Sequence, residues 1–337
     1  MKTTYLAKGT WVAAVFLLSA AGLLLSMFFA VSYGAKEMTL DTVWQAIIAY
    51  DPTLTLHQII HEMRLPRVLG AAVVGAAFAV AGALMQGLTR NPMADTGILG
   101  INAGATFMVA LSFAFFPAIP YAWLIFVSFA GALGSTLCIM LLGSMHAGGL
   151  TPLRLTVAGA VVAALLGSLS SGIAIYFELS QDLAFWHAGG VAGVGWFQLK
   201  LIAPVILVTI LLTLFLARSI SLLSLGDDVA LNLGTSTKRT RILGIASVVV
   251  LAGVSVSAVG SIGFVGLVIP HIARKLVGVD YRLVIPLSAL LGGILLVLAD
   301  LGARTVNPPK ELAVSALVAL IGVPFFLYIA RKERRNL

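Results

Sequence analysis

Residues 68–88 read VLGAAVVGAAFAVAGALMQGL and carry no charged side chain. A helix needs about 20 apolar residues to cross the hydrocarbon core of a bilayer, and this stretch is that long. Small residues recur in it at every fourth position, at Ala71, Gly75, Ala79 and Ala83. They let membrane helices approach closely, because apolar side chains gain nothing by leaving lipid for one another. The stretch therefore predicts a membrane helix against which other helices pack closely.

The whole chain has the composition of an integral membrane protein. Of its 337 residues, 60% are hydrophobic and 10% are charged, against about 25% charged residues in a soluble domain. Apolar runs recur along the entire length, so we expect an all-α polytopic fold with one membrane domain over 1–337 and no separate catalytic domain. The single cysteine, Cys138, excludes an intrachain disulfide. The basic residues behind the net charge of +8 are scattered between apolar runs, so no nucleic-acid partner is expected.

Ten apolar runs are candidate spans. The first is longer than the apolar core of a signal peptide and is expected to stay in the mature protein. An even count puts both termini on one side, where 15 of the 21 Lys and Arg residues would then lie, so both termini are expected in the cytoplasm. The candidate spans are 10–33, 68–88, 97–116, 120–143, 155–177, 197–217, 242–260, 262–277, 283–301 and 312–330.

The candidate spans are nearly free of ionisable residues. Only Asp300 and His271 come near them, and both fall close to predicted ends. An ion-coupled transporter usually keeps a charged side chain at mid-membrane. The chain also lacks a GxxxxGK[ST] phosphate loop, so it is not expected to hydrolyse ATP or to catalyse any covalent reaction. If the chain pumps a solute, a partner has to supply the energy.

A small polar island, residues 221–234, interrupts the apolar runs with the sequence SLLSLGDDVALNLG. Asp227 and Asp228 follow Gly226, where acids favour a helix N-terminus. Apolar residues come next, and Gly234 is a natural helix stop. The pattern predicts a short helix across the membrane face. It is either a docking element for a partner or a loop helix that packs on its own protein, and spacing alone leaves both open.

Several segments together resemble the permease subunits of type II ABC importers for iron-siderophores, haem and vitamin B12, the FecCD-like family. They occur over nearly the whole chain in family order. The matching segments are RLPR (64–67), QGLTRNPMADTGILGINAGA (86–105), FWHAGGVAGVGW (185–196), LGDDVALNLG (225–234), GSIGFVGLVIPHIAR (260–274) and ADLGARTVNPPKELAVSALVALIGVPFF (299–326).

The resemblance implies that segment 221–234 is a coupling helix that sits in a groove of a cytoplasmic ATPase. The implied partners are an ABC ATPase dimer, a second permease subunit that is identical or similar, an external substrate-binding protein and membrane lipid, with no cofactor. The residues expected to couple the permease to the ATPase are Leu225, Gly226, Asp227, Asp228, Val229, Ala230, Leu233 and Gly234.

The resemblance also implies that Arg64, Arg67 and Arg304 meet acidic residues on the two lobes of the binding protein. Arg64 and Arg67 are three positions apart and share a helix face, and Pro66 suits the first turn of a helix. Rim arginines of this kind aid encounter and orientation more than tightness. The alternative is that the arginines are ordinary anchors at the membrane interface.

Two loops are the expected cytoplasmic gate. By the resemblance, Asn91 and Met93 border the gate after the second span. Thr151, Pro152 and Leu153 face them before the fifth span, which lines the pathway in the family. Pro152 and Leu153 depart from the small hydroxyl residues common there, and both loops have the alternative of being plain connecting turns.

His57 and His61 are one helical turn apart, but no third ligand is evident, so an external amphipathic helix is expected there and no metal site.

The expected function is that of a permease for ferric siderophores in the plasma (inner) membrane of a bacterium, because siderophore systems are the commonest members of the family. A haem or vitamin B12 permease is the alternative within the family. An ATP-independent secondary transporter is the alternative from another class, and the missing intramembrane carboxylates weigh against it. An intramembrane enzyme would need a nucleophile and base or a metal cluster in the spans, and none is apparent.

Overall fold

The computed structural model describes residues 2–34, 38–144, 151–308 and 310–334. All regular structure in this part of the chain is helical, which confirms the all-α class. The elements are α1 (Lys2–Ser32), α2 (Leu40–Ile48), α3 (Thr55–Gln58), η1 (Ile59–Arg64), α4 (Leu65–Thr89), η2 (Thr96–Leu99), α5 (Ile101–Phe115), α6 (Tyr121–Ser144), α7 (Pro152–Tyr176), α8 (Ser180–Ala188), α9 (Trp196–Ser224), α10 (Asp227–Asn232), α11 (Thr237–Val259), α12 (Val265–Val277), α13 (Tyr281–Thr305) and α14 (Val314–Arg334).

Each of the ten predicted spans overlaps a helix. Seven helical segments are long and apolar enough to cross a membrane, and they contain α1, α4, α6, α7, α9, α11 and α13. The apolar parts of α5 and α14 are shorter, and α12 has only 13 residues. The multi-pass architecture is therefore clear, and ten crossings remain a prediction.

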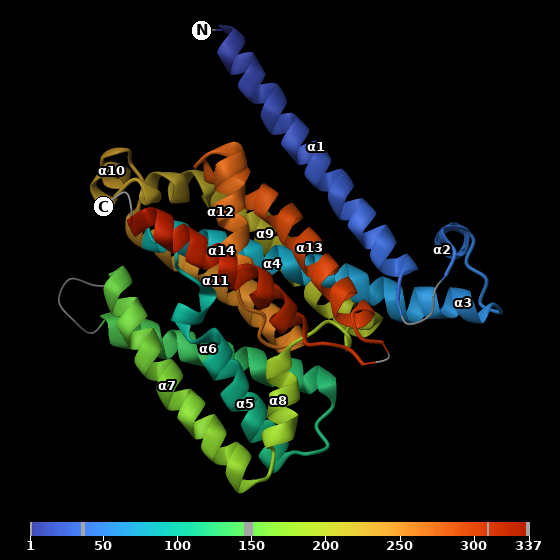
Figure 1. Cartoon of the computed structure of the whole chain (residues 1–337). Helices are drawn as coiled ribbons and strands as arrows, with labels where there is room; N and C mark the ends of the chain where they lie inside the picture. Colours follow the sequence, from blue (N-terminus) through green and yellow to red (C-terminus); the bar gives the residue numbers. More distant parts are fainter. Residues whose placement is uncertain (1, 35–37, 145–150, 309, 335–337) are drawn as a thin grey trace.

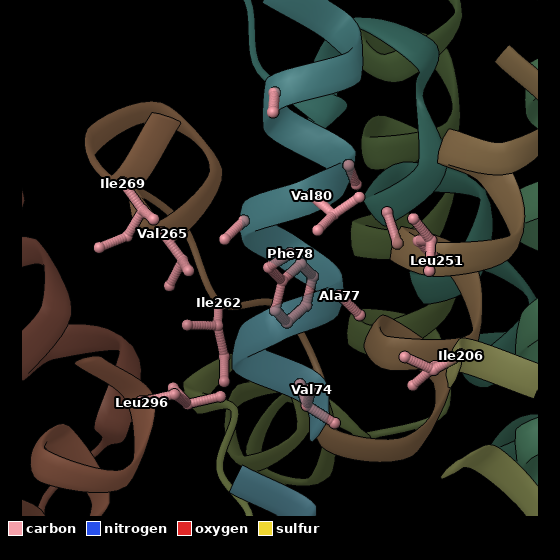
Figure 2. Close-up of a cluster of buried hydrophobic side chains, with 14 of the residues drawn as sticks. Val74, Ala77, Phe78, Val80, Ile206, Leu251, Ile262, Val265, Ile269 and Leu296 are labelled. Carbon is pink, nitrogen blue, oxygen red and sulfur yellow. The ribbon is translucent and has the colours of Figure 1, made fainter. Parts of the chain in front are cut away.

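Helix α4 is the centre of the bundle (Figure 1). The most apolar window of its segment, Thr55–Thr89, is 83% buried, against 17% for the window in α1. Figure 2 shows Phe78 of α4 inside a cluster of apolar side chains from the surrounding helices, among them Ile206 of α9, Leu251 of α11 and Leu296 of α13. Burial on all sides explains why α4 is apolar around its whole circumference.

Glycines allow the closest approaches to α4. A Cβ atom on Gly75 would collide with the carbonyl of Gly292 in α13, and one on Gly82 would collide with the backbone of Gly266 in α12. Backbone therefore lies against backbone at both crossings. The four small residues predicted to form the packing face of this helix are all buried, as expected from the sequence.

The bundle has two ends, one at each terminus of helix α4 (Figure 1). At the first, here called the α10 end, α4 and α9 finish and α11 and α13 begin. The Ser221 hydroxyl near the end of α9 donates to Asp280 before α13, and the Trp11 indole of α1 donates to the Leu276 carbonyl at the end of α12. At the second, here called the α3 end, α1 and α13 finish and α4 begins. Arg64 donates there to the Val31 carbonyl.

The start of α4 differs from the prediction. Pro66 is the second residue of α4, but α3, η1 and α4 form one continuous helical segment, so no separate external helix contains HQIIHE. The turn before the proline is a π-helix, in which the Leu65 amide reaches back to the Ile60 carbonyl. A proline clashes with the carbonyl four residues earlier in a regular helix, and the wider π turn relieves that clash.

The two histidines of this segment have separate roles. The buried His57 ring accepts a hydrogen bond from the Asp51 amide (3.1 Å), and His61 packs between Tyr50 and Trp196. Within the described ranges no group of three His, Cys, Asp or Glu side chains is placed to hold a metal ion.

Candidate functional site

The polar island between α9 and α11 folds as the short helix α10. Gly226 precedes it with φ of 133°, a conformation that L side chains rarely adopt. After it, the Thr235 amide donates to the Ala230 carbonyl and the Gly234 amide donates to the Leu231 carbonyl, both at 2.9 Å. With Gly234 at φ of 78°, these two bonds are a Schellman motif. The two glycines thus set both ends of the helix, which has the stop that the sequence predicts.

Helix α10 presents apolar side chains to solvent. Leu225 is 63% exposed, Leu231 is 56% exposed and Leu233 is 60% exposed, while Ala230 is fully buried against the bundle. Val229 and Asp228 are also exposed. Exposed apolar residues of this kind are available to a partner or to the membrane surface. The role of α10 as a docking element stays a prediction.

One carboxylate ties α10 to two long helices. Asp227, the first residue of α10, accepts two hydrogen bonds from Arg241 of α11, at 2.9 and 3.0 Å. Its Oδ2 atom, which accepts the second of these bonds, also lies 3.7 Å from the guanidinium of Arg90, which directly follows α4 and has a left-handed backbone conformation (φ 54°). Asp227 therefore joins α10 to α11 and to the end of α4.

The two predicted gate loops are at the α10 end as well. Asn91 follows Arg90, and its side-chain oxygen accepts a hydrogen bond from the Met93 amide at 2.9 Å. Thr151 is the N-cap of α7, where its hydroxyl accepts from the Arg154 amide. Leu153 is exposed in the first turn of α7. Pro152 begins that helix, and its side chain lies outside the described residues.

Helix α7 also contacts the segment that follows the first of these loops. A Cβ atom on Gly159 of α7 would collide with the carbonyl of Ile98 in η2. The two loops thus lead into elements that touch each other. Their role as a gate stays a prediction.

The three arginines predicted to dock the binding protein meet in one cluster at the α3 end. Arg67 donates to Asp300 of α13 with both Nε and Nη2 and to Glu311 with Nη1 and Nη2, at distances of 2.9 to 3.2 Å. The Arg304 Nε atom lies 3.4 Å from the Oδ2 atom of Asp300. Asp300 is fully buried, and the guanidinium groups of Arg67 and Arg304 balance its charge.

The other contacts of this cluster fasten the end of α1. Arg64 donates to the carbonyls of Val31 and Ser32 at 2.7 and 2.9 Å, and Arg304 donates to the Ala30 carbonyl. These carbonyls are in the last turn of α1, which has no following turn to bond them. Arg64 and Arg304 are nearly buried, whereas Glu311 is 44% exposed.

Sequence reasoning brought the three arginines to one side of the membrane but missed the two carboxylates between them. The signal in the sequence was weak. Asp300 is four residues before Arg304, which is the spacing of a helical ion pair, and Glu311 follows in the next loop.

A groove of about 710 Å³ runs between α5, α7 and α8. Most of its lining surface is apolar, and it is here called the polar groove for the hydroxyl, amide and imidazole groups set among the apolar residues. No Asp, Glu, Lys or Arg lines it within the described part of the chain. Desolvation by the surroundings lowers the pKa of His187, so the imidazole is mainly neutral at pH 7.

The family resemblance predicts that the span 155–177 lines the pathway, and its helix, α7, forms one wall of this groove. None of the predicted site residues whose side chains are described lines the groove. Its main polar side chains are Asn102, Thr106, Ser170, Ser171, Ser180 and His187.

These features define a class of protein: a multi-pass membrane subunit with an uncharged polar groove among its helices and an exposed apolar helix at one end. The profile of the FecCD transport family matches residues 22–332, and the chain belongs to that family.

Characterised relatives share most of its length. It is 51% identical over 315 residues to the iron(3+)-hydroxamate import system permease protein FhuB of Bacillus subtilis, covering 94% of this chain and 82% of that one. It is 39% identical over 324 residues to the ferric enterobactin transport system permease protein FepD of Escherichia coli, covering 94% and 95%.

A solved structure has the same fold with a TM-score of 0.83 at 28% identity, covering 95% of this chain and 99% of that one. It shows an inward-facing conformation of a transporter assigned to the metal-chelate type of ABC transporters.

Proposed function

We propose that this chain is the permease subunit of an ATP-driven importer that carries ferric siderophores, with ferric hydroxamates as the first candidates, across the plasma (inner) membrane of a bacterium. Membership of the FecCD transport family supports the class of protein. The relatives named for iron(3+)-hydroxamate and ferric enterobactin support the class of substrate. The observation that carries the proposal is α10, a short helix with exposed leucines, bonded through Asp227 to one long helix and close to the end of another.

In the proposed topology all ten apolar helices cross the membrane, and the α10 end faces the cytoplasm. Lys238, Arg239 and Arg241 begin α11 at that end, as the tendency of Lys and Arg to stay in the cytoplasm requires. Both termini then lie in the cytoplasm, and the α3 end faces outward.

In the proposed coupling step, an ABC ATPase dimer holds the exposed face of α10 in a groove. ATP-driven closure of the dimer moves α10 as a rigid piece, because its ends are set by Gly226 and Gly234. Asp227 passes the movement to α11 through Arg241 and to the end of α4 through Arg90. A second permease subunit, identical or similar, completes the pathway.

In the proposed docking step, the cluster at the α3 end receives an external binding protein. The cluster holds three arginines against two carboxylates, so it has a net positive charge that attracts acidic residues on a partner. Arg67 is the member that a partner reaches, because Arg64 and Arg304 are nearly buried. A partner carboxylate would take over Arg67 from the exposed Glu311, which makes Glu311 an internal competitor for docking.

In the proposed path, the substrate passes along the polar groove of α5, α7 and α8. Hydroxyl and amide groups can contact the oxygen-rich surface of a chelate without holding it by charge, and a carrier has to release what it binds. The loops at Asn91–Met93 and 151–153 would close the path at the cytoplasmic end. The chain catalyses no covalent step in this scheme, and ATP hydrolysis belongs to the partner.

Uptake of ⁵⁵Fe-labelled ferric hydroxamate siderophores by cells with and without this chain tests the proposal, with cobalamin and haem as parallel substrates. We expect selective loss of ferric hydroxamate uptake in the deletion strain and its return on complementation. Unchanged uptake of every siderophore, with no ATPase co-purifying with the chain, would contradict the proposed function.

A further inference from the structure

A second groove, of about 1020 Å³, runs between the C-terminal half of α9 and the N-terminal half of α11, next to α10. It is distinct from the polar groove of α5, α7 and α8. Leu233 and Gly234 of the coupling segment also line it, so an occupant would touch that segment.

The end of the groove nearest α10 is positively charged. Arg218 of α9 and Arg239 of α11 both line it and are exposed. No acidic residue lines the groove, and neither guanidinium has an ion pair within the ranges that the structure describes. Asp227 is nearby in sequence, but Arg241 and Arg90 already share it.

The start of α11 adds to this positive charge. A helix N-terminus carries a partial positive charge and favours anions. Helix α11 nevertheless has no acid in its first turn, which contains Lys238 and Arg239. The basic side chains therefore lie beside the partial positive charge of the helix N-terminus, and the two repel each other. An anion bound at this place would offset both positive charges.

The rest of the groove is mainly apolar, with Thr209, Thr240 and Ser247 among its lining residues, and has the length of half a bilayer. Phe215 is 83% exposed and Leu212 is 55% exposed on the α9 wall, and Leu243 and Val250 continue along α11. From Arg239 to Val250 the α11 wall extends about 16 Å at about 1.5 Å per residue. That is about half of the roughly 30 Å hydrocarbon core. The apolar walls thus run from the level of the headgroups to the middle of the membrane.

We propose that this groove binds one anionic phospholipid from the leaflet at the α10 end. Its phosphate lies between Arg218 and Arg239, near the Ser236 hydroxyl and the free amides at the start of α11, and one acyl chain lies along Phe215 and Leu243. A protein segment would need an acid at the same point and an apolar stretch along the membrane normal, whereas a phospholipid has both by its nature. The inference goes beyond the proposed transport function, since it does not depend on the substrate.

Native mass spectrometry of the full-length chain tests this, with palmitoyl-oleoyl phosphatidylglycerol and the matching phosphatidylcholine titrated in parallel. We expect the wild type to bind one phosphatidylglycerol in preference to phosphatidylcholine. The double variant Arg218→Gln/Arg239→Gln should bind phosphatidylglycerol about thirtyfold more weakly, because each basic residue near an anionic headgroup contributes about fivefold in affinity. Its affinity for phosphatidylcholine should not change.

The matched control is Lys275→Gln/Arg282→Gln, which removes two exposed positive charges from the same end of the bundle but does not touch the groove. It should retain the wild-type preference. A second pair tests the acyl chain: Ala246→Trp fills the groove wall, whereas Leu211→Trp is exposed on α9 outside the groove. Only Ala246→Trp should lose the lipid.

Equal phosphatidylglycerol binding by Arg218→Gln/Arg239→Gln and its charge control would overturn the proposal, as would wild-type binding by Ala246→Trp. Thermal unfolding of each variant in detergent checks that the fold is kept. Because lipid binding is measured without ATPase or substrate, its failure is distinguishable from failure of the proposed transport function.

Discussion

The two ends of α4 use charge in opposite ways. At the α3 end, five charged side chains close up between α4, α13 and the loop before α14, and most of them are buried. At the α10 end, a single half-exposed carboxylate, Asp227, holds a short helix whose leucines face solvent. In the first arrangement, the buried Asp300 and its two guanidinium partners balance one another's charge, and Glu311 is the most exposed member. The second leaves the surface of α10 free for a partner.

This difference separates residues that hold the fold together from residues that are exposed to a partner. Arg64, Arg67 and Arg304 are basic residues at one end of the bundle, yet they donate hydrogen bonds to groups of the protein itself. The apolar residues of α10 make far less contact with the protein that carries them. Substitutions at either end of α4 test this difference, and we expect their effects to differ in size and in kind.

The largest effect is expected from Asp300→Asn. The substitution keeps the shape of the side chain but leaves the guanidinium groups of Arg67 and Arg304 without their shared buried charge. Breaking a buried ion pair from one side costs about 3–5 kcal/mol. We expect a large loss of folded protein and a matching fall in the unfolding midpoint in detergent. Wild-type stability would mean that this buried charge does not stabilise the α3 end.

The next effect should fall on function and leave the fold intact. Val229→Asp/Leu231→Asp places two charges on the exposed face of α10, where substitutions change stability by no more than about 0.5 kcal/mol. Co-purification of the ATPase and siderophore uptake should both fall at least tenfold. The control Val229→Ile/Leu231→Met keeps the surface apolar and should transport normally. Retained ATPase in the charged variant would place the partner surface elsewhere.

A smaller effect is expected from Asp227→Asn, which weakens the link from α10 to Arg241 and Arg90. The pairs are partly exposed, so the loss of stability should be about 0–1 kcal/mol. We expect the ATPase to stay bound while uptake per ATP hydrolysed falls several-fold. Asp227→Glu keeps the charge and should restore most of the coupling. An unchanged ratio of uptake to hydrolysis would show that Asp227 transmits nothing.

The smallest effect is expected from Glu311→Gln. Arg67 holds the pKa of Glu311 below its ordinary value of 4.5, so this carboxylate is charged at neutral pH. A lowered pKa stabilises the folded state above the ordinary value, and the contribution is lost as pH falls through the folded pKa, below 4.5. The cost of the substitution at pH 7 should be about 0–1 kcal/mol, since the pair is partly exposed.

The same variant tests docking. Removal of the internal competitor should strengthen binding of the substrate-binding protein a few-fold, more at low salt than at high salt. Surface plasmon resonance with the immobilised permease complex would measure this. Weaker or salt-independent binding would mean that Arg67 is an anchor of the fold and does not meet the partner.

The sequence predicted much of the fold and one of the two charged regions. The small residues of 68–88 identified the central helix, because close packing needs Gly and Ala whatever the neighbour is. The acids and glycines of 221–234 identified α10, because the residues that set its two ends are next to it in the sequence. Ten apolar ranges located ten helices, although three of those are short for a membrane crossing.

The pairing at the α3 end could not be predicted in the same way. Arg67 and Asp300 are 233 positions apart, and they meet only because α4 and α13 cross at glycines that bring the two backbones together. The π turn before Pro66 and the groove between α9 and α11 also depend on how helices pack. Local spacing carries little information about such contacts.

The most direct test of the account is ATP-driven uptake into proteoliposomes containing the complete complex, with wild-type chain, Val229→Asp/Leu231→Asp and its apolar control compared side by side. We expect uptake of ferric hydroxamate by the wild type and the control, and loss of both uptake and bound ATPase in the charged variant. Wild-type uptake by the charged variant would contradict the claim that α10 couples this permease to its ATPase.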